Sequence, residues 1–210
     1  QQPKIPFVEI LKSIPEVFGI RLNEEPEYKV LKKDGPVEVR QYSSQLHAKV
    51  TLKGLDFDTY RNKAFELLAA YIFGANSGKT KMAMTSPVLQ KNDSEKMAMT
   101  SPVLQQQSGD QEWTMTFILP SKYSLASVPK PDNPQIKIVE EPGYEAVTLR
   151  YTGTNSLQSL KKHEDQLSAW LLKNPQYKVN GKFFAAQYDA PFAVPFLRRN
   201  EVLAKVTSAH

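Results

Sequence analysis

The strongest constraint on the fold of this chain is one order of predicted elements that occurs twice. In the first half, an alternating strand over 46–52 is followed by a helix over 57–73 and by strands that break at a proline. In the second half, a strand over 144–151 is followed by a helix beginning near residue 156 and by strands that again break at a proline. Two βαββ units of this kind can pack their sheets into one curved surface with a helix against each side. We therefore expect a single α+β domain, a distorted open β-barrel built from two βαββ pseudo-repeats with two flanking helices.

Period-two alternation and turn residues mark the remaining strands. They are expected over residues 28–31, 37–42, 113–119, 136–139, 183–188 and 201–206. Residues 120–135 contain four prolines and are expected to form a surface loop. Residues 1–26 carry apolar residues at helical spacing but also Pro15, which predicts an amphipathic arm rather than one straight helix. The single domain then spans 27–206, and 207–210 form a tail.

The helix over 57–73 is apolar over more of its circumference than one core contact requires. Asp56 or Asp58 can cap its N-terminus, and Gly74 lies where a left-handed C-terminal cap is expected. At 100° per residue, the apolar residues form two adjacent stripes. One stripe holds Phe57, Tyr60, Ala64, Leu68, Tyr71 and Ile72, and the other holds Phe65, Ala69 and Phe73. The first stripe is expected to face the core. The second either packs under another part of the chain, such as the N-terminal arm, or lines a ligand pocket.

A ten-residue segment is duplicated: KMAMTSPVLQ occurs at Lys81–Gln90 and, without change, at Lys96–Gln105. Two copies are too few for a solenoid. The polar residues 91–95 between them are typical of a turn. We therefore expect the two copies to pair as one longer hairpin.

Composition excludes several classes of site. The chain has no cysteine, which excludes a disulfide scaffold, a thiolate metal site, a cysteine nucleophile and cysteine-ligated haem. There is no GxSxG elbow, HExxH helix or glycine-rich phosphate loop, so no motif predicts an enzyme. His47 lies in a strand, His163 lies near the apolar face of the second helix, and His210 lies in the tail. No two of them have metal-ligand spacing, and we expect no metal site built from protein ligands.

The net charge of +5 suits anionic partners without requiring them, because the charges are scattered singly or in pairs. Phe183, Phe184 and Tyr188 on one strand could stack on bases, but neither an RNP pattern nor a basic stripe accompanies them. We expect no nucleic-acid partner. No apolar run is long enough to span a membrane. Because the sequence starts at Gln1, it leaves open whether a targeting segment precedes it.

Four ordered blocks of the sequence resemble the SOUL haem-binding protein family. They are Tyr28–Val30 with Val37–Tyr42, Phe73–Asn76 with Lys81–Val88, Ile118–Ser121, and Ala186–Phe192 with Arg198–Val202. The doubled KMxMTxPV segment and the closing RRNEV most resemble the plant plastid and cyanobacterial branch of that family. The resemblance implies the fold expected above. It also implies a carrier or buffer of haem and related porphyrins, rather than a catalyst.

The same resemblance implies where the ligand lies. In one branch of the family the porphyrin occupies an apolar groove beside the first helix and the loop before the last strand. The matching groove residues here are Phe65, Ala69, Phe73, Phe192, Val194, Phe196 and Leu197, with Arg61, Arg198 and Arg199 as candidates for the two propionates. An apolar slot with one or two cations suits a large apolar disc that carries two carboxylates.

Gln41 occupies the position at which some members carry an axial histidine, so we expect haem binding without an obligatory histidine ligand. One propionate-contacting arginine of the family matches Asn62, with Arg61 one residue away. The resemblance favours a plastid, or a cyanobacterial cytoplasm with thylakoid association, and a tetrapyrrole-pathway or thylakoid-associated protein as a partner.

Two other functions stay open. The first is a tetrapyrrole-processing or small-molecule hydrolytic enzyme on the same fold, for which Tyr60 and Glu66 are the acid/base candidates in the groove. The second is a protein-interaction module that uses the N-terminal arm as a docking helix.

Overall fold

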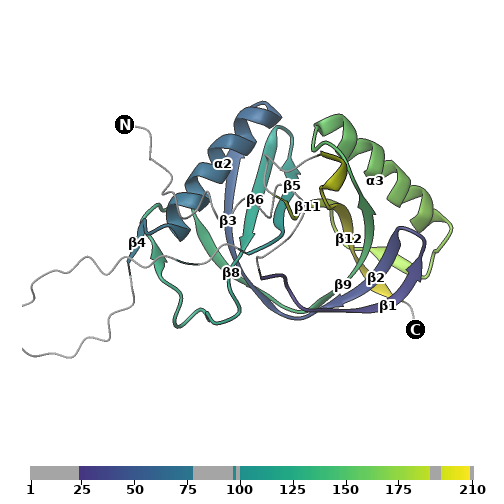
Figure 1. Cartoon of the computed structure of the whole chain (residues 1–210), viewed down its shortest axis with the longest axis horizontal. Coiled ribbons are helices and arrows are strands. Elements are labelled where there is room, and N and C mark those ends of the chain that lie inside the picture. The colour runs from purple at the N-terminus through teal and green to yellow at the C-terminus, as the bar shows by residue number, and fades with distance from the viewer. Residues whose placement is uncertain (1–23, 78–96, 98–99, 190–194, 209–210) are drawn as a thin grey trace, which may run out of the picture.

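The computed structural model describes residues 24–77, 97, 100–189 and 195–208. In this part of the chain, an antiparallel ten-stranded sheet curls into a half-barrel, and the helices α2 (Phe57–Ile72) and α3 (Leu157–Leu172) pack on it side by side (Figure 1). The strands of this sheet are β1 (Tyr28–Asp34), β2 (Val37–Tyr42), β3 (Gln45–Lys53), β5 (Val103–Gly109), β6 (Glu112–Ile118), β8 (Lys137–Glu141), β9 (Tyr144–Tyr151), β10 (Tyr177–Val179), β11 (Phe184–Gln187) and β12 (Asn200–Ser208). The expected α+β architecture with two helices is confirmed.

The order of the strands shows how the two repeats are combined. It runs β1-β2-β9-β12-β11-β5-β6-β3-β8, with β10 beside β12. The first repeat contributes β3, α2, β5 and β6, and the second contributes β9, α3, β11 and β12, so the repeats meet where β5 pairs with β11. Each repeat also receives a strand that precedes the other one. β2, which leads into β3, pairs with β9, and β8, which leads into β9, pairs with β3.

The turns that follow these two strands lie side by side at one tight corner. Ser43 and Ser44 separate β2 from β3, and Pro142 and Gly143 separate β8 from β9. A Cβ atom on Gly143 would lie 2.9 Å from the backbone oxygen of Tyr42, closer than real Cβ contacts come. Because the obstacle is backbone and cannot swing away, this corner requires glycine.

Several strands, among them β2, β6, β9 and β12, present alternate side chains to two separate cores. On the face that carries the helices, apolar residues of both repeats form one cluster, and Leu68 of α2 and Leu167 of α3 are both fully buried in it. The opposite face of the sheet has a smaller apolar cluster of its own. Its buried members are Tyr42, Leu104, Ile118, Ala146, Phe184, Ala186, Tyr188 and Leu203.

Helix α2 begins and ends as its sequence indicates. Asp56 is the N-cap, because its Oδ1 accepts a hydrogen bond of 3.0 Å from the backbone N–H of Thr59. Gly74 follows the helix with a φ of +121°, a conformation that favours glycine. The stripe expected to face the core is buried except for its first residue, Phe57, which is half-buried against Trp113.

Two predictions about the segments after α2 need correction. Over Val103–Gln105, β5 pairs with β6 on one side and with β11 on the other, so the expected pairing between the duplicated segments is wrong there. The first copy lies outside the described residues. Residues 120–135 are also more than a surface loop. Val128 and Pro129 are buried, and the short strands β4 (Asn76–Ser77) and β7 (Lys130–Pro131) pair. Within the described part of the chain, neither helix has the length and apolar character needed to cross a membrane.

Candidate functional site

The second apolar stripe of α2 runs from the core out to solvent. Phe65 is half-buried, and its ring packs edge-on against the ring of Phe117 on β6, with centroids 5.4 Å apart. Ala69, one turn later, is half-buried. Phe73, at the end of the helix, has 49% of its surface exposed. Only the C-terminal end of the stripe therefore presents a large apolar side chain to solvent.

Arg61 lies one turn before Phe65 and holds the start of α2 to the turn before α3. Its Nη1 donates a hydrogen bond of 2.8 Å to the backbone oxygen of Asn155, and it lies 4.0 Å from a carboxylate oxygen of Asp58. Its side chain keeps 26% of its surface exposed. The guanidinium thus has one backbone partner and a weak carboxylate contact, which leaves donor capacity for an anion.

The loop before β12 reaches the same turn. Its 3-10 helix, η1 (Pro195–Leu197), carries Phe196 and Leu197, which are 72% and 38% exposed. Asn200, at the start of β12, donates a hydrogen bond of 3.1 Å to the backbone oxygen of Gly153. The turn at 153–155 therefore contacts the start of α2 through Arg61 and the end of this loop through Asn200. Phe192 and Val194 lie outside the described residues.

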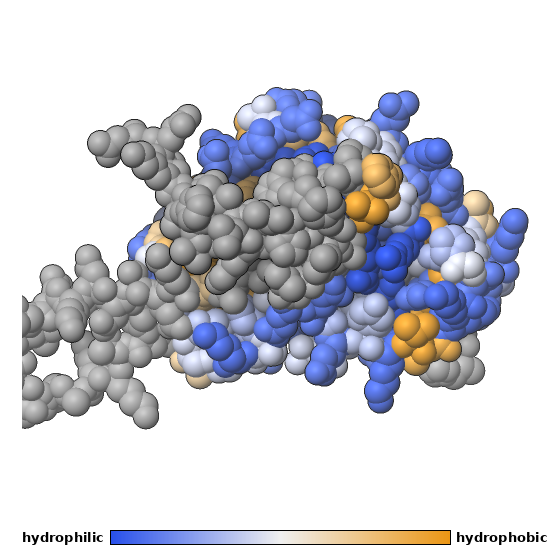
Figure 2. All heavy atoms as spheres, in the orientation of Figure 1, coloured by the Kyte–Doolittle hydropathy of each residue, from blue (hydrophilic) through white to orange (hydrophobic). Residues whose placement is uncertain are grey.

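Outside the atoms drawn in grey, Figure 2 shows a largely hydrophilic surface on which hydrophobic patches are small and separate. Large exposed apolar side chains are the exception on such a surface, and a few single ones need no explanation. Phe73, Phe196 and Leu197 are notable because they are among the residues that the family resemblance implies as groove walls.

Of the two arginines before β12, the structure places Arg199 in a buried ionic network and leaves Arg198 half-buried. Arg199 contacts Glu25 at 3.0 Å and Glu201 at 2.9 Å, and its guanidinium lies 3.8 Å from the centre of the Tyr188 ring. A propionate at Arg199 would have to compete with two carboxylates that are already in place.

Sequence reasoning missed the centre of this network, Glu201, which is completely buried. Arg40 donates two hydrogen bonds to its carboxylate, at 2.8 and 3.0 Å, and the hydroxyl of Tyr188 donates a third at 2.8 Å. Burial by itself would raise the pKa of Glu201, but the hydrogen bonds and charges of Arg40 and Arg199 hold it below its ordinary value. In the sequence, Glu201 begins a predicted strand that also carries Lys205, so no pattern there marks its carboxylate as buried.

Neither of the two described histidines lies on α2 or on the loop before β12. His47 is buried on the sheet face opposite α2, and burial, with the charge of Lys49, lowers its pKa to about 4. His163 stacks on the ring of Tyr151 at 3.6 Å, and its Nδ1 lies 2.6 Å from the backbone oxygen of Ser159. No three histidine or acidic residues in the described ranges are grouped so that they could hold a metal ion.

The acid/base candidates in the groove do not converge. Tyr60 is buried in the core, and burial raises the pKa of its hydroxyl. Glu66, on the same helix, is exposed.

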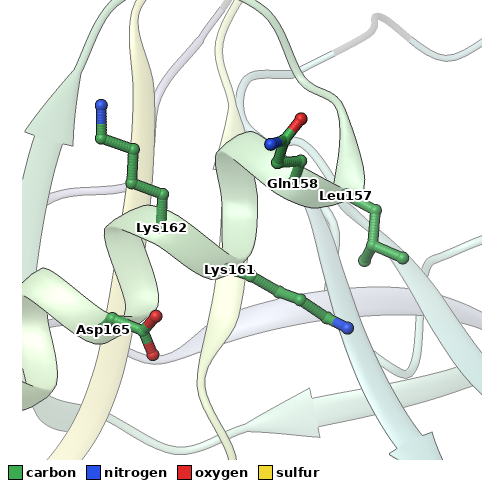
Figure 3. Close-up of a pocket in the computed structure, with 5 residues that line it drawn as sticks. All are labelled: Leu157, Gln158, Lys161, Lys162 and Asp165. Atoms are coloured by element: carbon green, nitrogen blue, oxygen red, sulfur yellow. The ribbon is translucent and has the colours of Figure 1, made fainter.

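Two hollows lie elsewhere on the described surface. The larger, of about 600 Å³, follows α3 and is lined by Leu157, Gln158, Lys161, Lys162 and Asp165. Figure 3 shows all five on one helix, with Lys161 and Lys162 pointing apart, so the hollow is open surface rather than a cleft. The other, of about 230 Å³, lies on the sheet face opposite the helices and is lined by polar and aromatic residues of several strands.

Comparison with solved structures gives the fold alone, because the identities are low. The C-terminal domain of EcmrR has a TM-score of 0.57 at 12% identity, over 87% of this chain and 99% of that chain. A hydrolase from Listeria innocua has a TM-score of 0.53 at 15% identity, over 84% of this chain and 94% of its own. An uncharacterized conserved protein from Listeria innocua has a TM-score of 0.51 at 17% identity, over 97% of this chain and 100% of that chain.

A search of curated proteins found no significant match. The family profile described as SOUL heme-binding protein matches residues 23–205, which is most of the chain and both repeats. The chain therefore belongs to the SOUL haem-binding protein family.

Proposed function

We propose that this protein binds haem and related porphyrins in the groove between α2 and the loop before β12, as a tetrapyrrole carrier or buffer. One observation carries the proposal. Large apolar side chains stay exposed on both expected walls, with Phe73 49% exposed on one and Phe196 72% exposed on the other. Burying a side chain of this size is worth about 1.5–3 kcal/mol, so an apolar ring seated between the walls would be bound mainly by packing.

The described residues fit the porphyrin ring and its acid groups better than they fit a histidine-ligated iron. Phe65, Ala69 and Phe73 would contact the ring, and Arg61 would pair with a propionate. Neither His47, on β3, nor His163, on α3, lies on the two elements that form the proposed groove, which supports binding without an obligatory histidine ligand. When bound, haem supplies an iron centre and a visible absorption band. The chain's own part is to hold the ring and to exclude water from one of its faces.

The resemblance of the duplicated segment and of the closing RRNEV supports two further parts of the proposal. These are a plastid, or a cyanobacterial compartment associated with thylakoids, and a partner from the tetrapyrrole pathway or the thylakoid. Nucleic acid is not proposed, because Phe184 and Tyr188, which would have to stack on bases, are buried.

The test is a haemin titration of the full chain, followed by absorbance and by quenching of tryptophan fluorescence. The decisive variant is Phe73→Asp, and Leu172→Asp is its matched control. Leu172 is the last residue of α3, and Phe73 directly follows the last residue of α2, so the two occupy similar positions. Leu172 is 84% exposed. We expect the Phe73 variant to bind haemin at least about tenfold more weakly, which is 1.4 kcal/mol. The control should bind as the wild type does, and both variants should melt near the wild-type temperature.

Protoporphyrin IX, which has no iron, should bind with an affinity similar to that of haemin, because the proposed site recognises the ring. Equal weakening by the two aspartate variants, or no binding of either porphyrin, would contradict the groove assignment. If Phe73→Asp unfolds the protein, the end of the stripe is core rather than groove.

A further inference from the structure

The cavity of about 230 Å³ lies on the opposite side of the sheet from the proposed porphyrin groove. Its walls come from β3, β5, β6, β9, β11 and β12, with Glu141 at the end of β8. Along β3 the side chains alternate, so His47 and Lys49 line the cavity while Ala48 and Val50 belong to the core under the helices. A ligand here would share no side chain with the groove beside α2.

The charged groups that line the cavity have an excess of positive charge. Lys49, Lys182 and Lys205 face one acidic residue, Glu141, which leaves a net charge of +2. Lys49 contacts the Glu141 carboxylate at 3.4 Å, and Lys205 pairs with its other oxygen. Both lysines keep about a third of their side-chain surface exposed, at 31% and 34%. One carboxylate between two partly exposed ammonium groups leaves donors for a second anion.

One ring nitrogen of His47, Nδ1, is a buried hydrogen-bond acceptor in the cavity, and no described residue donates a hydrogen bond to it. Its residue is 3% exposed, and its Nε2 lies 2.8 Å from Oε1 of Gln45. With that oxygen as acceptor, Nε2 carries the ring proton and Nδ1 carries a lone pair. Nδ1 makes no hydrogen bond to any described residue and lies 4.0 Å from Oε2 of Glu141, too far for one. Leaving a buried polar atom unsatisfied destabilises the protein, and a donor on a ligand would remove that cost.

The remaining lining and the volume define the body of the ligand. Leu104 and Phe184 are buried and form an apolar wall, while the ring of Tyr144 already contacts the ring of Tyr42 and the ammonium group of Lys205. Liquid water takes about 30 Å³ per molecule, so the cavity is equivalent to about eight waters. That volume admits a single-ring organic molecule and is far too small for a porphyrin.

We propose that this cavity is a second ligand site, which takes a small organic acid that also carries a hydroxyl group. The carboxylate binds at Lys49 and Lys205, the hydroxyl donates to Nδ1 of His47, and the ring lies against Phe184. The site is independent of the porphyrin function, and either can fail without the other.

The test uses 3-hydroxybenzoate as the probe, followed by the ring resonances of His47 in an NMR titration and by calorimetry. Benzoate lacks the hydroxyl, phenol lacks the carboxylate, and benzylamine reverses the charge. We expect 3-hydroxybenzoate to bind most tightly and to shift the His47 signals, benzoate and phenol to bind at least about fivefold more weakly, and benzylamine not to bind.

Lys205→Met should weaken binding of 3-hydroxybenzoate about tenfold, while Lys161→Met, on the exposed surface of α3, should leave it unchanged. Lys49→Met provides a second test if the Lys205 variant folds poorly. Phe73→Asp should not affect this probe, and haemin should not displace it. The proposal is overturned if the probe leaves the His47 signals unmoved, if benzylamine binds as well, or if benzoate binds equally tightly.

Discussion

Replacing Glu201 by glutamine should destabilise the protein more than any change to a surface charge. The wild-type carboxylate accepts hydrogen bonds from Arg40, Arg199 and Tyr188 and is completely buried. Glutamine keeps the shape but removes the negative charge. It therefore leaves two guanidinium groups without their main counter-ion, and their side chains are only 2% and 10% exposed.

The size of the effect follows from what remains buried. Removing one partner of a buried ion pair costs about 3–5 kcal/mol, because the other charge stays out of water. We expect a loss near 4 kcal/mol, since Glu25 and Glu38 still neutralise part of the charge on the two arginines. The assay is urea unfolding followed by circular dichroism. At a slope of about 2 kcal/mol per M, the midpoint should fall by about 2 M.

Two further variants check the reasoning. The double variant Glu201→Gln/Arg40→Met removes one of the two orphaned charges and should be more stable than Glu201→Gln alone. Glu112→Gln breaks an exposed pair with Lys53 and should leave the midpoint almost unchanged. A cost below about 1 kcal/mol for Glu201→Gln, in the range of a surface pair, would refute the assignment of a buried, ionised network.

Three more predictions concern the core, the pH dependence and the histidines. Leu68→Ala should cost about 3 kcal/mol in urea unfolding, because Leu68 is completely buried, and should leave the affinity for haemin unchanged below the transition. The folded-state pKa of His47 is about 4, below its ordinary value of 6.5. As pH falls, the unfolded chain therefore binds the proton at a higher pH than the folded protein does. The free energy of unfolding should drop between about pH 6.5 and 4. The pKa values of Glu201 and Glu141 are lowered, so these groups lose their contributions to stability only below about pH 4.5. Unfolding midpoints that stay constant between pH 6.5 and 5 would contradict the assignment to His47. A drop in that range that persists in His47→Gln would contradict it as well. In haemin titrations, His47→Ala and His163→Ala, singly and together, should keep the wild-type affinity and Soret band, and loss of a low-spin spectrum in either would show that a histidine ligates the iron.

The elements were predictable because the signals for them are local. Alternation located most strands of the sheet, although not the short strands β4, β7 and β10, and short-range capping rules limited the start of α2 to Asp56 or Asp58. The structure decides between these two, since the choice depends on which carboxylate reaches the N–H of Thr59. The prediction for the duplicated segment was wrong because it, too, rested on a local signal. Its repeat suggests a local hairpin, but both edges of β5 are taken by strands from elsewhere in the chain.

The candidate site was predictable only in part, because exposure depends on what a neighbouring strand covers. Phe65 and Phe73 lie on one stripe at helical spacing, yet Phe117 of β6 covers the first and leaves the second 49% exposed. The buried network could not be foreseen from spacing at all, since Arg40 and Glu201 are 161 residues apart. The cavity of about 230 Å³ could not be predicted for the same reason. Its lysines come from β3, from the segment before β11 and from β12, which are far apart in the sequence.

The exchange of β2 and β8 between the repeats has a consequence for how such a fold can be divided. A chain that held only one repeat would lack the strand that pairs with its outer edge here. The first repeat would lose β8, which pairs with β3, and the second would lose β2, which pairs with β9. That edge would then present unpaired N–H and C=O groups to solvent. Two copies of a single repeat could satisfy each other only by trading those strands. The protein has, in one chain, the architecture of a strand-swapped dimer, and we expect its isolated halves to associate or to stay unfolded rather than to fold alone.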